Sequence, residues 1–235
     1  MIRLCKQVAP DVPLHGSTQM SIHSLPGVQL CAAWGLTRVV LSRELNRDEI
    51  RYICKNSPIE IEIFGHGALC MCYSGQCYLS AAIGGRSGNR GRCAQPCRQS
   101  YGYGRWENRY PLSLRDNCLV PYLKELEDMG AENVSLVTPS HLTAYLLRAF
   151  EIYKPKIPVV YNTGSYEKVS TLKLIDPFVD IYLPDMKFYS PALSKRYLGK
   201  ENYFEVASEA IAFMANSKPL RMTDDGKMLS GCIVR

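Results

Sequence analysis

Residues 62–98 read EIFGHGALCMCYSGQCYLSAAIGGRSGNRGRCAQPCR and contain five cysteines, Cys70, Cys72, Cys77, Cys93 and Cys97, within 28 positions. In a chain without a secretory signal, such a dense group of thiols is more often a metal or iron–sulfur site than a set of disulfides. The glycines between the cysteines allow the backbone to fold tightly around a compact inorganic centre. This segment therefore predicts a metal centre, and the rest of the chain is expected to form the fold that holds it.

The composition is that of an ordinary soluble globular protein, with 46% apolar and 21% charged residues in 235 positions. This length is within the range of one α/β barrel. No signal peptide and no run of about 20 apolar residues is found, which predicts a cytoplasmic protein with reduced thiols and no membrane contact. Four further cysteines lie in apolar surroundings and are expected to be buried small hydrophobic residues: Cys5, Cys31, Cys54 and Cys232.

Short apolar or β-branched runs alternate with helical patterns along the chain, which indicates βαβ units and a parallel sheet. Eight predicted strands match the number in a closed (β/α)8, or TIM, barrel, so we expect residues 1–235 to form a single barrel-like domain. The strands are expected at 13–17, 38–42, 59–64, 110–114, 133–137, 159–162, 181–183 and 232–235, and the helices at 25–34, 47–55, 119–129, 141–153, 169–174 and 203–214.

In such a barrel the chemistry lies on loops after the carboxyl ends of the strands, and the cysteine-rich segment directly follows the third predicted strand. Glu62 and His66 at the base of this segment, and Gln19 after the first strand, are the candidate catalytic residues. A hydrogen-bonded structural role remains open for His66, and a loop cap remains open for Gln19.

Arginines gather in the same segment, with no acidic residue between Gly84 and Tyr103. Arg86, Arg90 and Arg92, together with Arg98, would suit an anionic partner such as RNA or a small carboxylate. The alternative is a solvated loop whose arginines pair with acids elsewhere.

The amino-acid sequence of about residues 1–130 resembles the U32 family, long labelled collagenase-like peptidases. The resemblance rests on GGRSGNRGRCAQPCR at 84–98 and on the upstream residues Glu62, Phe64, His66, Gly67, Ala68, Leu69, Cys70, Tyr73, Ser74, Gly75, Cys77 and Ser80. It implies a (β/α) barrel and an iron–sulfur protein that supports oxygen-independent hydroxylation of RNA bases or of a quinone ring. For some RNA-modifying members, prephenate is implicated as a small anionic substrate.

A 4Fe–4S cluster normally takes four thiolate ligands. Cys70 and Cys77 belong to the family signature, and the short spacing of Cys93 and Cys97 allows both to reach one cluster. Cys118 is a rival fourth ligand, because it lies near a predicted helix N-terminus that would favour a thiolate. Cys72 is expected to be a bystander, and a four-cysteine zinc site is the chemical alternative.

Residues 131–235 instead resemble the later barrel strands of radical S-adenosylmethionine proteins of the pyruvate formate-lyase-activating-enzyme type. The resemblance lies in NVSLVTPSHL, in IPVVYNTGSYEKVSTLKLIDPFVDIYLPDMKFYSP and in GCIVR, and it places Thr138, His141, Asn162, Asp185, Lys187 and Arg235 at strand ends. That family needs a CxxxCxxC motif, whereas here Cys93 and Cys97 are followed by Ser100. S-adenosylmethionine is therefore not expected as a cofactor, and the chain reads as a chimera of two barrel families.

The favoured function is that of a U32-like iron–sulfur protein supporting hydroxylation of an RNA base, with an electron donor that the sequence does not name. A radical S-adenosylmethionine enzyme or activase and an inactive chimeric or truncated barrel are the alternatives. The peptidase label finds no support in the motifs, because neither a nucleophile elbow, nor HExxH, nor a catalytic carboxylate pair is present.

Overall fold

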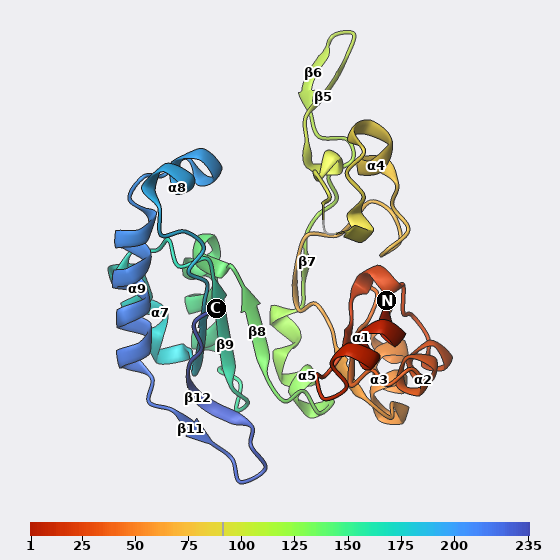
Figure 1. Cartoon of the computed structure of the whole chain (residues 1–235), viewed down its shortest axis with the longest axis horizontal. Helices are drawn as coiled ribbons and strands as arrows, with labels where there is room; N and C mark the ends of the chain where they lie inside the picture. The colour runs from red at the N-terminus through yellow and green to blue at the C-terminus, as the bar shows by residue number, and fades with distance from the viewer. Residues whose placement is uncertain (91) are drawn as a thin grey trace. The chain divides into compact units, whose positions relative to one another are not determined.

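The computed structural model describes residues 1–90 and 92–235, except for the side chains of residues 103, 106 and 108. It divides into two compact units, Met1–Cys118 and Leu119–Arg235. Figure 1 shows the elements of both units along the chain. Each unit has its own hydrophobic core, so each is described separately.

The N-terminal unit is built on a parallel sheet of order β1-β2-β3, formed by His15–Gly16, Arg38–Val40 and Glu60–Glu62. Helices α2 (Leu25–Ala33) and α3 (Arg47–Asn56) connect the strands. Asn46 begins α3 with a capping box, in which its side chain accepts from Glu49 N–H while the Glu49 carboxylate accepts from Asn46 N–H. The core contains Ile22, Val28, Cys31, Leu36, Val39, Leu41 and Ile53.

The thiol segment, defined as residues 68–116, lies between two short strands that pair antiparallel in a separate two-stranded sheet, β4 (His66–Gly67) and β7 (Asn117–Cys118). Within it, β5 (Tyr101–Tyr103) and β6 (Trp106–Arg109) form a hairpin that projects from the unit in Figure 1. The unit also contains α1 (Ile2–Val8), η1 (Thr18–Met20), α4 (Leu79–Gly84), η2 (Gly88–Arg90) and η3 (Pro96–Arg98).

The C-terminal unit is an α/β sheet of order β11-β12-β10-β9-β8, in which β12, β10, β9 and β8 run parallel and β11 runs antiparallel. The strands are β8 (Val134–Val137), β9 (Val159–Thr163), β10 (Ile181–Pro184), β11 (Arg221–Met222) and β12 (Met228–Cys232). The helices are η4 (Val120–Tyr122), α5 (Leu123–Asp128), η5 (Pro139–Leu142), α6 (Thr143–Ile152), α7 (Val169–Ile175), η6 (Asp176–Phe178), α8 (Pro191–Leu198) and α9 (Tyr203–Ser217).

Helical spacing explains how this second core is packed. Leu146 and Phe150 lie four residues apart on α6, and Leu172 and Ile175 lie three apart on α7, so each pair faces the sheet from one side of its helix. They pack with Tyr161 and Tyr182, which are opposite one another on β9 and β10. Each such buried side chain contributes about 1.5–3 kcal/mol through the removal of apolar surface from water.

The structure confirms the predicted α/β class but shows no closed barrel. Among the described residues neither parallel sheet closes on itself, because β1 and β3 are the two edges of one sheet and β8 is an edge of the other. The last sheet ends instead in the antiparallel β11, which occupies the free side of β12. A strand predicted at 110–114 is wrong, because a turn closed by Ser113 N–H donating to Tyr110 C=O lies there. The other predicted strands each overlap an observed one, with 232–235 sharing only Cys232.

No helix in the described part of the chain combines the length and the apolar character needed to cross a bilayer. Among the cysteines expected to be buried, Cys31 is fully buried, whereas Cys5, Cys54 and Cys232 are partly buried. Burial raises the pKa of the Cys31 thiol.

A buried carboxylate stabilises the C-terminal core. Glu167 is 8% exposed, and its carboxylate accepts hydrogen bonds from the Tyr161 hydroxyl at 2.7 Å and from the Thr163 hydroxyl. Burial raises the pKa of Tyr161, and the negative charge of Glu167 adds to this effect, so the phenol remains a donor.

Replacing Tyr161 with Phe removes one donor from this buried carboxylate. We expect the free energy of unfolding to fall by about 1–3 kcal/mol, because one oxygen of the buried carboxylate loses its donor away from water while Thr163 still donates to the other. Urea unfolding followed by circular dichroism measures the change. Tyr145→Phe on α6, where the side chain is 76% exposed, is the matched control and should leave stability unchanged. An equal decrease in the free energy of unfolding in both variants would contradict this account of the core.

Candidate functional site

The thiol segment is held against the carboxyl edge of the N-terminal sheet by one buried serine. Ser74 is 3% exposed, and both its N–H and its hydroxyl donate to Glu44 Oε1, at 2.9 and 3.1 Å. Ser21 Oγ donates to the Ser74 carbonyl at 2.7 Å. Glu44 follows β2 and Ser21 follows β1, so the loops after two parallel strands position the thiol segment, as expected for strands that end at the same edge.

The next residue has to be glycine. Gly75 has a φ of +79°, and a Cβ built there would lie 2.4 Å from the Gln19 carbonyl oxygen and 2.6 Å from Ser21 Oγ. A side chain would therefore meet backbone, which cannot move aside without breaking the Ser21–Ser74 contact. Gln19, predicted as a catalytic residue, thus contributes its backbone to this anchor, while its side chain is exposed.

Arg43 brings a cation next to one of the predicted ligands. Its guanidinium carbon lies 4.3 Å from the centroid of the Phe64 ring, and Nη1 donates to Cys70 Sγ at 3.6 Å. The cation–π contact limits the positions open to the guanidinium. The loops after β2 and β3 together set the surroundings of Cys70.

Arg98 fixes the far side of the thiol segment. Its guanidinium donates to the carbonyls of Leu114 and Leu69 at 2.7 and 3.1 Å, to Ser113 Oγ at 2.7 Å, and to Asp116 at 3.2 Å. The side chain is 21% exposed, so it serves the loop's own structure and pairs with an acid. The other three arginines of the predicted basic patch are exposed, and Arg86 Nε donates to the carbonyl of Arg92 at 3.0 Å.

Four thiols of this region are exposed, Cys70, Cys77, Cys93 and Cys118, whereas Cys72 and Cys97 are partly buried. The donor type suits an iron–sulfur cluster or zinc, since thiolate is a soft ligand. Their arrangement does not yet form such a site, because no three His, Cys, Asp or Glu side chains of the described residues are gathered as a metal-binding group. Gln95 N–H instead donates to Cys93 Sγ at 3.3 Å.

The structure brings two of the predicted residues face to face. His66 and Cys118 are directly opposite in the β4–β7 pair, and such side chains lie about 4.5–5.5 Å apart between their Cβ atoms. His66 Nδ1 is buried and has no hydrogen-bond partner among the described residues. Glu62, predicted as its catalytic companion, lies 3.7 Å from Arg38 Nη1 in an ion pair on the sheet.

Sequence reasoning missed Ser74 and Ser21 as the anchoring pair, although Arg43 and Glu44 stood at a predicted strand end. The only available signal was Ser74–Gly75 at the centre of the Cys70–Cys77 interval, because a Ser-Gly pair marks a tight turn.

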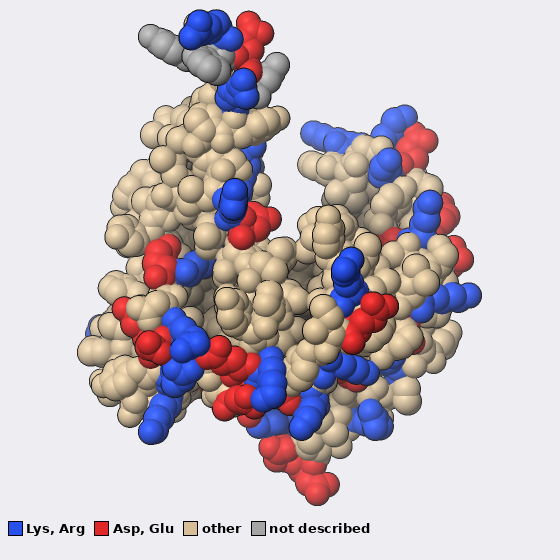
Figure 2. All heavy atoms as spheres, turned by 180° about the vertical axis from the view of Figure 1, so that it is seen from behind, with Lys and Arg blue, Asp and Glu red and all other residues tan. Residues whose placement is uncertain are grey.

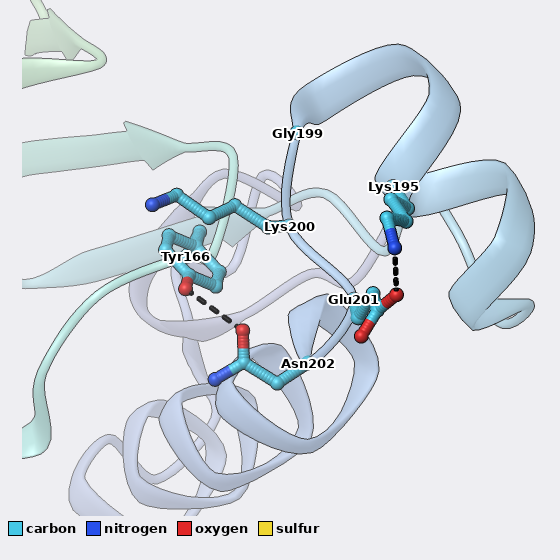
Figure 3. Close-up of a pocket in the computed structure, with 6 residues that line it drawn as sticks. All are labelled: Tyr166, Lys195, Gly199, Lys200, Glu201 and Asn202. Atoms are coloured by element: carbon cyan, nitrogen blue, oxygen red, sulfur yellow. Dashed lines mark hydrogen bonds and ion pairs between the residues drawn. The ribbon is translucent and has the colours of Figure 1, made fainter.

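A surface hollow of about 470 Å³ lies in the C-terminal unit and contains none of the predicted site residues. Figure 3 shows its lining, in which Tyr166 donates to Asn202 and Lys195 pairs with Glu201. It is an open feature next to α8 and α9, so it does not define a site for thiol chemistry. On the face shown in Figure 2, basic and acidic side chains are interspersed rather than separated by sign.

An α/β protein with a cysteine-rich excursion anchored at the carboxyl edge of a parallel sheet is the class that these features define. The chain belongs to peptidase family U32, which it matches over residues 1–180. The match extends beyond residue 130, where the sequence resemblance was expected to stop. No solved structure matches the chain.

Three curated relatives show what the chain is similar to. It is 34% identical over 169 residues to tRNA hydroxylation protein P1 of Bacillus subtilis, covering 67% of this chain and 40% of that protein. It is 41% identical over 133 residues to a 23S rRNA 5-hydroxycytidine synthase of Escherichia coli, covering 54% and 20%. It is 33% identical over 176 residues to a collagenase of Porphyromonas gingivalis, covering 67% and 42%. The chain thus spans only a fifth to two fifths of these relatives.

Adding a methyl group at Gly75 should loosen the thiol segment. We expect Gly75→Ala to increase the rate at which trypsin cuts after the arginines of this segment, because the clash with Gln19 displaces Ser74 from Glu44. Gly85→Ala is the matched control, since Gly85 also has a positive φ, of +64°, but a Cβ there meets nothing within 4 Å. Equal cleavage rates in the two variants would show that the anchor does not depend on this close approach.

Proposed function

We propose that this chain is part of a U32-type protein that supports the hydroxylation of an RNA base. The observation that carries the proposal is the family match together with relatives named for tRNA hydroxylation and rRNA hydroxycytidine synthesis. The anchored thiol segment lies at the sheet edge where α/β proteins hold their ligands, which supports the same reading. The relatives named for these activities are longer than this chain, which covers 40% and 20% of their lengths.

The proposed cofactor is a 4Fe–4S cluster bound by Cys70, Cys77, Cys93 and Cys118. Their exposure supports this set, because three of these thiols lie on loops, Cys118 lies at the end of β7, and all four are accessible to a cluster. Cys97 is a weaker fourth ligand, because it is partly buried in η3. A zinc site with the same thiols is the alternative outcome of the test.

The exposed Arg86, Arg90 and Arg92 are proposed to contact an anionic partner. RNA backbone is favoured over a small carboxylate such as prephenate, because three exposed guanidinium groups without an intervening acid can follow successive phosphates. We further propose a cytoplasmic location, where RNA is found and thiols remain reduced.

Other functions receive less support. One relative is named as a collagenase, which favours a peptidase function. The chain, however, contains none of the nucleophile or zinc motifs that hydrolysis requires. A radical S-adenosylmethionine activity for residues 131–235 and an inactive chimera remain predictions. In the absence of CxxxCxxC, we expect no cleavage of S-adenosylmethionine.

Serine substitution tests the cluster. After anaerobic purification we expect roughly four irons and four sulfides per chain. Single replacement of Cys70, Cys77, Cys93 or Cys118 by Ser should abolish iron binding, because a hydroxyl is a poor ligand for iron in a cluster. Cys72→Ser is the control and should retain iron, while Cys97→Ser decides the fourth ligand. Stoichiometric zinc without iron, or iron retained in all four variants, would reject the cluster.

Salt dependence tests the arginines. The slope of log K for single-stranded RNA against log salt should become less negative by about 2 when Arg86, Arg90 and Arg92 are all changed to Ala, given about 0.7 per phosphate contact. The control changes Arg3, Arg148 and Arg221 to Ala, which removes the same charge from exposed sites elsewhere. Slopes that change equally in both variants would mean that only net charge matters.

A further inference from the structure

Two tyrosines of the thiol segment expose their rings to an unusual degree. Tyr73 and Tyr78 are each 73% exposed, and neither phenol forms a hydrogen bond within the part of the chain that the structure describes. In the sequence, Tyr73 lies three residues after Cys70, and Tyr78 directly follows Cys77. An exposed aromatic ring therefore accompanies each of two proposed cluster ligands.

The backbone that bears both rings is fixed. The Tyr73 carbonyl accepts a hydrogen bond from Gln76 N–H at 3.0 Å, which closes the turn that the buried Ser74 anchors. The Tyr78 carbonyl accepts from Ala82 N–H at 2.8 Å, because Tyr78 is the N-cap of α4. A tyrosine has only two side-chain torsions, so a ring on a fixed backbone loses little conformational entropy when it binds a partner.

The loop that contains the exposed arginines is attached to the same helix. Ser80 on α4 is 4% exposed, its carbonyl accepts from Arg86 N–H at 3.2 Å, and its hydroxyl accepts from Ala94 N–H at 2.9 Å. Tyr78 precedes α4 and Arg86 follows its end, and a helix of six residues is about 9 Å long. The rings and the cations thus belong to one folded part of the thiol segment, which carries the label α4 in Figure 1.

The charges of this part favour an anionic partner. No acidic residue occurs between positions 62 and 107. Two acids that hold the segment in place are already occupied, because Glu44 accepts hydrogen bonds from Ser74 and Asp116 accepts one from Arg98. Exposed aromatic rings beside cations are the combination that binds single-stranded nucleic acid, in which bases stack on the rings and phosphates pair with the cations.

We infer that Tyr73 and Tyr78 stack on the bases of a single-stranded RNA whose phosphates pair with the three exposed arginines. This inference rests on the function proposed above and adds the residues that position the bases. Stacking on tyrosine accepts any base, since every base has a π-face. The two rings therefore hold the RNA against the thiol segment without selecting its sequence.

The test compares two labelled single-stranded RNAs of about ten nucleotides, one of adenylate and one abasic, by fluorescence anisotropy with the full chain at low salt. Both RNAs carry the same phosphates, so only the adenylate RNA reports stacking. Tyr73→Ala and Tyr78→Ala should each weaken binding of the adenylate RNA by about fivefold to 150-fold and leave binding of the abasic RNA unchanged. Tyr73→Phe and Tyr78→Phe should bind like the unmodified chain, because the ring is retained.

Tyr52→Ala on α3 is the matched control, because Tyr52 is 60% exposed in the same unit but lies outside the thiol segment. It should leave both affinities unchanged, and circular dichroism checks that each variant is folded. Three results would overturn the inference while leaving RNA binding by the arginines intact: unchanged adenylate affinity in either alanine variant, an equal loss on abasic RNA, or no preference of the unmodified chain for adenylate over abasic RNA. If the unmodified chain bound neither RNA, the RNA partner of the proposed function would be rejected as well.

Discussion

The hydrogen bonds between Ser74 and Glu44 are the constraint on which the position of the thiol segment in the N-terminal unit depends. A loop rich in glycine and cysteine has few apolar side chains with which to bury itself, so its position must come from polar contacts. Two donors from one buried serine onto one carboxylate provide that position, and the charge on Glu44 makes each bond stronger than a neutral one. Everything between Cys70 and Cys77 is located relative to this point.

The two units use different means to hold polar groups at equivalent places. In the N-terminal unit, the Ser21 hydroxyl after β1 and the Glu44 carboxylate after β2 form hydrogen bonds with Ser74 of an incoming loop. In the C-terminal unit, charged side chains after β9, β10 and β12 bond one another directly. Both groups lie after the carboxyl ends of parallel strands, the edge at which open α/β sheets hold their ligand-binding residues.

The sequence was sufficient for features that depend on local periodicity. The strands at 38–42, 133–137 and 159–162 and the helices at 25–34 and 203–214 all appear, because buried β-branched runs and i, i+4 apolar spacing need no distant partner. The barrel could not be judged in this way, since closure depends on which edges meet. The pairing of His66 with Cys118 was equally invisible, because the two residues are separated by the whole thiol segment. Likewise, the ion pairing of Glu62 was not visible in the sequence, because Arg38 is in register with Glu60 on the neighbouring strand and reaches Glu62 diagonally, at 3.7 Å.

The pairing of β4 with β7 has a consequence for how the chain tolerates change. Because Gly67 and Asn117 are partners in that pair, residues 68–116 begin and end next to each other at this two-stranded ladder. The cost of closing such an excursion rises only slowly with its length, so insertions within it disturb the supporting fold little. The thiol segment is therefore an insertion that tolerates changes in length. Its hairpin and loops can lengthen or shorten while the β1-β2-β3 sheet keeps its own core.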